Sequence, residues 1–417
     1  MNGRRRAGGW TIAAAVAVAV AGGCGGDGSS TMPSGGGGNS GNLNQRPKPA
    51  APLFDDTRLH DIKLTMSPDD WQSIIADSRG DEWRHATVSY DGVVVDDVGV
   101  RPAGESSRFA GNVKMSIRIK FDAFGMNGDF GGYSDVNVKG EYDDYSMMRE
   151  RLSYSVFAAL MPAPKAAHTT LEVNDDPRGV FTLREDWDKT SIGEHFSQPF
   201  GPLYRLRPYS EAEDPYVYMG DDPATYVPHP WERHFTMAAR GDEVIAPFLQ
   251  AIAANPSPID SVAAVDNLLA YLSVCAIVMT TDGLVGNTGA ADHWEYFDPQ
   301  TGKFFVLPWD PDNSFGSQGE MPTRSIESKL GRNAYVRVVR DQGNYQDQYR
   351  AKLAAAIAAV PLATVQATAD RIYDQIKDAA HADTVKTFDN GSFDWSRDDI
   401  KNFASQRYTS LQQQLGM

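Results

Sequence analysis

Hydrophobic and polar residues alternate along much of the first half of the chain, as they do in strands with one buried face. The alternation predicts a series of strands and a later hairpin that turns at residues 174–179. A helix is predicted over about 146–160, and the prolines at positions 162 and 164 then stop it. The predicted strands cover residues 58–66, 85–90, 93–101, 114–121 and 136–139, and the hairpin covers 169–184.

In the second half of the chain, apolar residues recur at intervals of three and four, which is the spacing of amphipathic helices. A predicted hairpin over 293–307 is the exception. Strands followed by helices favour an α+β chain with a β-rich N-terminal lobe over 53–185 and an α-rich C-terminal lobe over 186–417. The predicted helices cover residues 187–195, 242–254, 259–280, 330–340, 344–359, 361–381 and 395–415.

The first 23 residues have the organisation of a lipoprotein signal peptide. Arginines at positions 4–6 precede an uncharged run over 10–21 that is too short to cross a bilayer, and small residues then lead to Cys24. We expect cleavage before Cys24 and attachment of lipid to it; an ordinary secretory signal with an incidental cysteine is the alternative. Residues 24–52 are rich in Gly, Ser, Asn and Pro and predict a flexible linker. The expected location is therefore a bacterial membrane, with the folded domain outside the cytoplasm.

Composition restricts the function further. The formal net charge is −16, and the phosphate backbone of nucleic acids requires clustered Lys and Arg, so a nucleic-acid partner is not expected. With Cys24 lipidated, Cys275 has no disulfide partner, since the chain contains only these two cysteines. The sequence contains no HExxH zinc motif, GxSxG nucleophile elbow or Walker loop.

Two polar segments that follow apolar elements in the second half are candidates for chemistry. Asp282 and Asn287 are five positions apart, as the catalytic Asp and a metal-binding Asn are in protein kinases. Further along, Asp310 and Asp312 have a spacing that suits one hard divalent cation such as Mg²⁺. Asp310 also follows Asp282 in the chain order of the kinase metal-binding aspartate. On spacing alone, acidic turns exposed to solvent remain the alternative interpretation.

The order of several short motifs resembles the spore coat protein H (CotH) kinase family. The resemblance runs from about Phe54 to the C-terminal helices and implies a two-lobed, atypical protein-kinase-like fold. It also implies transfer of the ATP γ-phosphate to Ser or Thr of secreted or surface proteins. The motifs are RPAGESS (101–107), KMSIRIKF (114–121), MRERLSY (148–154), PAP (162–164), NDDPRGVFTLRE (174–185), GKFFVLPWD (302–310) and Phe315-Gly316.

The resemblance implies catalytic and metal-binding roles. Asp282 is the implied catalytic-loop aspartate, and Asp310 and Asp312 are the implied ligands of Mg²⁺, or of Mn²⁺ or Ca²⁺. Relatives usually have His-Asn where this chain has His293-Trp294, so the metal-binding asparagine is either lost or replaced by Asn287 or Asp292.

The resemblance also implies nucleotide-binding residues. Glu150 is the implied acid that orients a lysine, and Trp309 is either an adenine-stacking surface or a core residue. The identity of the lysine stays open, since several precede the helix of Glu150. The implied basic positions are Lys114 with Arg118 or Lys120, and the lysines that could pair with Glu150 are Lys114, Lys120 and Lys139.

Two alternatives to a kinase remain at this point. The chain could be a cell-surface adhesion module that keeps a kinase-like scaffold without catalysis. It could also be a calcium-stabilised structural lipoprotein in which Asp310 and Asp312 hold an ion. Relatives usually read Arg-Gly-Asn-Ser-Ser where this chain has an acidic Glu105 within residues 101–107.

Overall fold

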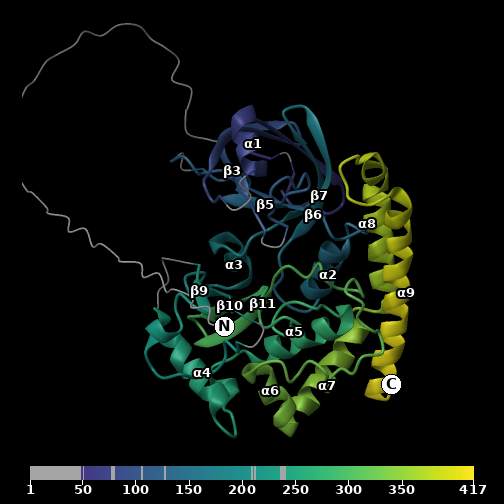
Figure 1. Ribbon diagram of the computed structural model, residues 1–417. Helices are drawn as coiled ribbons and strands as arrows, with labels where there is room; N and C mark the ends of the chain where they lie inside the picture. The colour runs from purple at the N-terminus through teal and green to yellow at the C-terminus, as the bar shows by residue number, and fades with distance from the viewer. Residues whose placement is uncertain are drawn as a thin grey trace, which may run out of the picture. The chain divides into compact units, whose positions relative to one another are not determined.

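The computed structural model describes residues 48–49, 51–76, 80–104, 107–125, 128–207, 210, 213–234 and 241–417 (Figure 1). The predicted signal peptide, Cys24 and nearly all of the predicted linker lie outside these residues, as do Glu105 and Ser106. The described residues belong to one compact unit that begins at Asn44.

The strands of the first half close into a seven-stranded barrel in the order β1-β2-β3-β4-β5-β7-β6. Neighbouring strands are antiparallel except β1 and β6, which are parallel. Alternate apolar side chains such as Ile62, Val100 and Ile119 fill the interior, and α1 (Pro68–Ala76) adds Trp71 to the same core. The strands are β1 (Leu59–Met66), β2 (Arg84–Tyr90), β3 (Val93–Pro102), β4 (Ile117–Lys120), β5 (Asp135–Gly140), β6 (Ala166–Val173) and β7 (Asp176–Arg184).

A four-stranded antiparallel sheet in the order β11-β10-β8-β9 lies among the helices of the second half. Its strands are β8 (Leu203–Leu206), β9 (Trp231–Arg233), β10 (His293–Asp298) and β11 (Lys303–Pro308). The hydrophobic pattern predicted the β10–β11 hairpin but missed β8 and β9, since strands of four and three residues are too short to show alternation.

Among the described residues, the helices of the second half agree in number and order with those predicted from the apolar spacing. They are α3 (Lys189–His195), α4 (Ile245–Ala253), α5 (Val265–Val278), α6 (Ala334–Asp341), α7 (Gly343–Ala359), α8 (Leu362–Ala382) and α9 (Asn390–Leu415), with 3₁₀ helices η1 (Pro223–Thr225), η2 (Asp242–Val244) and η3 (Ile259–Ser261). In the described part of the chain, no single helix is long and apolar enough to cross a bilayer, although the bent pair α7–α8 passes when counted together.

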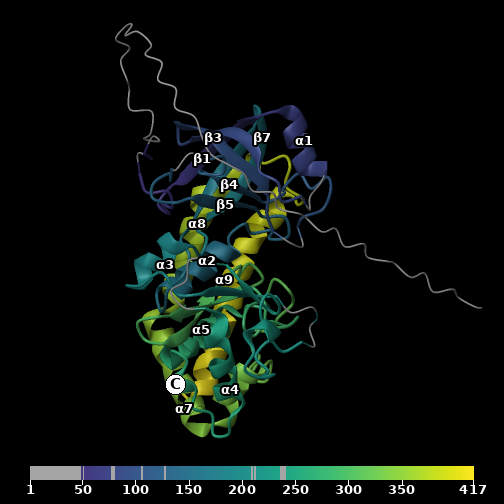
Figure 2. The same cartoon turned by 90° about the vertical axis from the view of Figure 1, so that its left-hand side faces the viewer.

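Packing divides the chain differently from the predicted border at residue 185. Helix α2 (Arg149–Ala158) lies between barrel strands in the sequence, but Leu152 and Phe157 are buried in the core of the helical part. The ring of Phe157 is 5.5 Å from that of Tyr271 on α5. Helices α8 and α9 run alongside both the barrel and the helical part (Figure 2). The α+β class is therefore confirmed, while α2 and the C-terminal helices join the two parts.

Candidate active site

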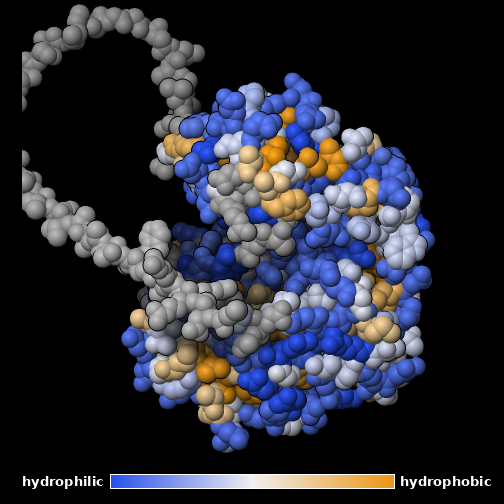
Figure 3. Space-filling view, viewed as in Figure 1, coloured by the Kyte–Doolittle hydropathy of each residue, from blue (hydrophilic) through white to orange (hydrophobic). Residues whose placement is uncertain are grey.

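A polar cleft of about 710 Å³ opens between one wall of the barrel and the loops around β10 and β11. The recess is visible as a blue, hydrophilic hollow in the space-filling view (Figure 3). Strands β3, β4, β5 and β7 supply the barrel wall, and the segments that follow α5 and β11 supply the opposite side. Charged side chains dominate the lining, so the cleft suits a charged ligand rather than an apolar one.

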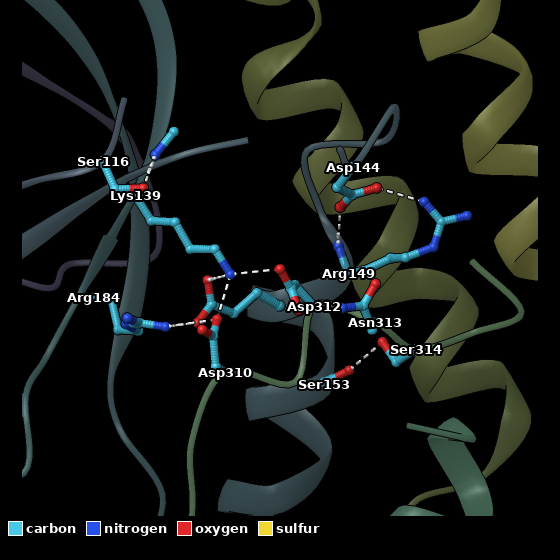
Figure 4. Close-up of polar contacts among 12 residues, drawn as sticks. Ser116, Lys139, Asp144, Arg149, Ser153, Arg184, Asp310, Asp312, Asn313 and Ser314 are labelled. Carbon is cyan, nitrogen blue, oxygen red and sulfur yellow. Dashed lines mark hydrogen bonds and ion pairs between the residues drawn. The ribbon is translucent and has the colours of Figure 1, made fainter. Parts of the chain in front are cut away.

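Lys139 and Arg184 hold a cluster of carboxylates at one end of the cleft (Figure 4). Lys139 Nζ donates to Asp310 and to Asp312, at 2.8 Å from Oδ2 of Asp312, and lies 3.3 Å from Oε2 of Glu150. Arg184 Nη1 donates to Oε1 of Glu150 at 2.5 Å and to Oδ1 of Asp310 at 3.0 Å. Three carboxylates therefore share two cations.

Local structure explains why these side chains meet. On β5, Val136 and Val138 belong to the barrel core, and the alternation of a strand turns Lys139 to the opposite face. Asp310 comes two residues after the end of β11 and has a left-handed backbone (φ 51°). Its amide N–H donates to the Tyr154 hydroxyl at 3.0 Å, so α2 fixes the backbone of this loop.

The cluster carries more negative than positive charge. Burial raises the pKa of Asp312 to about 7; Lys139 opposes this shift and the nearby Asp310 carboxylate adds to it. Burial also acts on Asp310, but Lys139 and Arg184 outweigh it and hold its pKa well below the usual value. For Lys139, the carboxylates overcome burial and raise its pKa well above normal. Because three carboxylates share only two cations, an added cation would be stabilised at this cluster.

Asp282 lines the same cleft. Helix α5 ends at Val278, the next residue Met279 has a left-handed backbone (φ 57°), and the chain then turns towards the loop after β11. Thr281 N donates to the Asn313 carbonyl at 2.8 Å, and Phe315 N donates to the Val278 carbonyl at 2.7 Å. Burial raises the pKa of Asp282, with a hydrogen bond from Asn313 opposing the shift. The two acidic segments predicted from the sequence therefore form one site.

Two buried cations support the loop that carries Asp282. Lys329 Nζ donates to the Thr280 carbonyl at 2.5 Å, and Arg407 Nε on α9 donates to the Ala276 carbonyl at 2.7 Å. Positive charge is favourable at the C-terminal end of a helix, where carbonyl groups lack intrahelical partners. The spacing of charged residues gave no indication of these contacts, because each joins segments far apart in the sequence.

The structure does not bring Lys114 to the cleft. Residues 113–114 form a turn and β4 begins only at Ile117, so the alternation of the predicted strand does not extend to Lys114. Its ammonium group is fully buried and donates to Oδ2 of Asp383 at 2.9 Å and to the Val180 carbonyl at 2.6 Å. The lysine that pairs with Glu150 is Lys139, which resolves the alternative left open by the sequence.

Asn287 and Lys120 also lie apart from the carboxylate cluster. Asn287 Nδ2 donates to Oε1 of Glu320 at 2.8 Å, and Lys120 Nζ is 3.5 Å from Oδ1 of Asp122. Neither residue lines the cleft, whereas Asn313, next to Asp312, does. The metal-binding role assigned to Asn287 therefore has no support in its position.

Arg118 and Trp309 lie in the cleft as predicted. Arg118 Nη2 is 2.9 Å from Oδ1 of Asp135 and 2.5 Å from Oδ2 of Asp186. The Arg184 guanidinium lies 4.0 Å from the centre of the Trp309 ring. Sequence reasoning missed Arg184. It lies opposite Asn137 in the pairing of β5 with β7, a non-consecutive pairing that the sequence pattern does not supply.

The donor atoms of Asp310 and Asp312 are the hard carboxylate oxygens that Mg²⁺ and Ca²⁺ prefer. Within the described ranges, no group of three or more His, Cys, Asp or Glu side chains is already arranged around a metal position. Instead the Lys139 ammonium lies between the two carboxylates. The chemistry of the site fits a divalent cation, since two acidic side chains, Asp310 and Asp312, face the same point.

Comparison with known proteins agrees with the geometry. The family described as CotH kinase protein matches residues 100–411. Inner spore coat protein H of Bacillus subtilis (strain 168) is 24% identical over 302 residues, which cover 69% of this chain and 80% of that protein. The matched range includes every residue of the carboxylate cluster and Asp282.

Proposed function

Because this chain belongs to the CotH kinase family, we propose that it transfers the γ-phosphate of ATP to Ser or Thr of secreted or surface proteins. One observation carries the proposal: Lys139, Asp282 and Asp310 come from separate segments and line one cleft, and the buried Glu150 pairs with Lys139. Protein kinases use a Lys–Glu ion pair, a catalytic-loop aspartate and a metal-binding aspartate for this reaction. The barrel and the helical part would then correspond to the two lobes of an atypical kinase-like fold.

Each residue has a role that follows from its surroundings. Asp282 would accept the proton of the attacking hydroxyl, and its raised pKa makes it a better base than an exposed aspartate. Lys139 and Arg184 would position phosphate oxygens by charge. Asp310 and Asp312 would hold Mg²⁺, which when bound neutralises negative charge on the phosphates.

We also propose that the kinase works outside the cytoplasm, anchored to a membrane through lipid on Cys24. A flexible segment over residues 24–52 would give a root-mean-square reach of about 30 Å. The anchor would restrict the enzyme to protein substrates near the membrane surface, and it requires a source of ATP in the same compartment.

The test uses the chain from Asn44 to Met417 with γ-labelled ATP and Mg²⁺ or Mn²⁺, on itself and on a generic protein acceptor. We expect label on protein that falls at least about 100-fold in Asp282→Asn and Asp310→Asn. Asp347→Asn, at an exposed position on α7, is the matched control and should keep full activity.

Absence of label above the two variants, with no change in melting temperature on adding nucleotide, would overturn the proposal. Nucleotide binding without transfer would indicate the non-catalytic adhesion role instead. A rise in melting temperature with Ca²⁺ alone would indicate the structural role of Asp310 and Asp312.

A further inference from the structure

A small cavity lies beside helix α5 and the loop that carries Asp282, outside the cleft described above. Its volume is about 20 Å³, which is enough for one particle of the size of a water molecule. Helix α5, the residues that follow it and the segment 325–330 form most of the wall, with one residue each from α7 and α9. Lys329 and Arg407 are the cations of this lining, and none of the described lining residues is acidic.

Both cations have N–H groups left over after their contacts with described residues are counted. The Lys329 ammonium has three N–H groups, and its hydrogen bond goes to the Thr280 carbonyl. The Arg407 guanidinium donates from Nε to the Ala276 carbonyl and from Nη1 to two carbonyls within 322–324, which leaves both N–H groups of Nη2. The two residues are only 8% and 1% exposed, so bulk water replaces few of these missing partners.

Neither Lys329 nor Arg407 forms an ion pair with a carboxylate of the described residues. Glu320 is the acid nearest in effect to Lys329, but its own side chain is bound by Arg324 and Asn287. Burial accordingly lowers the pKa of Lys329, and it lowers that of Arg407 to about 10. A buried charge without an opposite charge costs free energy, which a bound anion would recover.

We propose that this cavity binds a small inorganic anion such as chloride, with Lys329 and Arg407 as its hydrogen-bond donors. Two positive charges favour an anion over neutral water, and the volume suits a monatomic ion rather than phosphate. The bound anion would fix the two side chains that hold the Thr280 and Ala276 carbonyls, and it would thereby stabilise the loop that carries Asp282. This inference does not depend on the proposed kinase activity.

The melting temperature of the full-length chain in detergent micelles tests the proposal in sodium chloride and in sodium gluconate of equal ionic strength. Chloride at about 150 mM should raise the melting temperature by about 2–4 °C relative to gluconate, whose anion is too large for the cavity. Equal melting temperatures in the two salts would overturn the inference, since this is the result expected when the cavity holds only water.

Lys329→Gln removes the charge but keeps a side-chain donor, and it should abolish most of the chloride-dependent rise. Lys377→Gln is the matched control, because Lys377 lies on α8 away from the cavity and its ion pair with Asp374 is exposed. This control should keep the full rise. An undiminished rise in Lys329→Gln would place the chloride elsewhere and overturn the inference.

Anomalous diffraction from wild-type crystals grown in bromide gives the answer even where Lys329→Gln does not fold. We expect a bromide peak within hydrogen-bond distance of Lys329 Nζ and Arg407 Nη2. A cavity without that peak would overturn the inference.

Discussion

Two lysines, the fully buried Lys114 before β4 and the largely buried Lys139 on β5, have opposite surroundings. Lys114 meets Asp383 in a fully buried pair, and two backbone carbonyls complete its hydrogen bonds. Lys139 faces three carboxylates, of which Asp310 and Asp312 keep 30% and 28% of their side-chain surface exposed. Burial acts against the charge of both lysines, but only at Lys139 do the carboxylates raise the pKa above normal.

The difference shows how an ion pair that stabilises the fold can be distinguished from one that can bind a ligand. At Lys114 one cation balances one carboxylate, and the Asp383 side chain also accepts from the Val180 and Val385 amides. That arrangement fastens the α8–α9 connection to β7. At Lys139 the surplus of carboxylates and their access to solvent leave the cluster able to exchange partners with a ligand.

The largest expected effect is the loss of phosphate transfer when Lys139 is replaced. Lys139→Met should reduce phosphate transfer by about 100-fold or more, because a charge that positions the phosphates is lost. Its free energy of unfolding should change by less than about 1 kcal/mol, since Arg184 still pairs with Glu150 and Asp310 and water can reach the carboxylates. Labelled-ATP assays and urea denaturation measure the two quantities.

Lys120→Met is the control for Lys139→Met, since Lys120 is a barrel lysine outside the cleft whose ion pair with Asp122 is partly exposed. It should alter neither activity nor stability appreciably. Loss of several kcal/mol in Lys139→Met would contradict the view that its cluster is functional rather than structural.

Replacing Lys114 by Met should have the opposite pattern, with a large loss of stability and a small loss of activity. Lys114→Met leaves the buried Asp383 carboxylate without its cation and should lower the free energy of unfolding by about 3–5 kcal/mol. Under conditions where the variant stays folded, transfer activity should fall much less than in Lys139→Met. Restoring stability by adding Asp383→Asn would confirm that the uncompensated charge causes the loss; a double variant no better than the single one would exclude it.

Glu295 is a third case for the comparison, a buried carboxylate with no lysine beside it among the described residues. Its hydrogen-bond donor there is the neutral hydroxyl of Tyr216. Burial raises its pKa to about 8, from an ordinary value of 4.5. Because the Glu295 carboxyl ionises at a lower pH in the unfolded chain than in the folded one, the free energy of unfolding is highest at low pH. It falls as pH rises from about 4.5 to 8. Glu295→Gln should remove part of this decline and stabilise the protein at pH 8 by about 1–3 kcal/mol.

Thermal denaturation of wild type and Glu295→Gln between pH 5 and pH 8 measures the effect. The partly exposed Glu327→Gln, which removes an acid paired with Arg350, supplies the baseline for removing one acidic charge. Parallel stability curves for wild type and Glu295→Gln would show that Glu295 is ionised and compensated in the folded protein.

Much of the fold could be predicted because the pattern of buried and exposed residues within one strand or helix repeats over a short stretch of sequence. Alternation identified the barrel strands, and apolar spacing identified the helices from α3 to α9. The prediction was wrong about the start of β4, because residues 111–116 combine alternation with turns that periodicity does not detect. It also placed α2 with the barrel by chain order, although its apolar face packs on α5.

The sequence by itself determined which residue types could act, and it brought Asp282, Asp310 and Asp312 forward as a pair of acidic segments after apolar elements. Only the tertiary structure decided which basic residues they meet. Lys114, Lys120 and Lys139 are alike as residue types, but their partners depend on strand register and on contacts with α2 and the α8–α9 connection. Those contacts join residues up to 269 positions apart, and local periodicity carries no information about them.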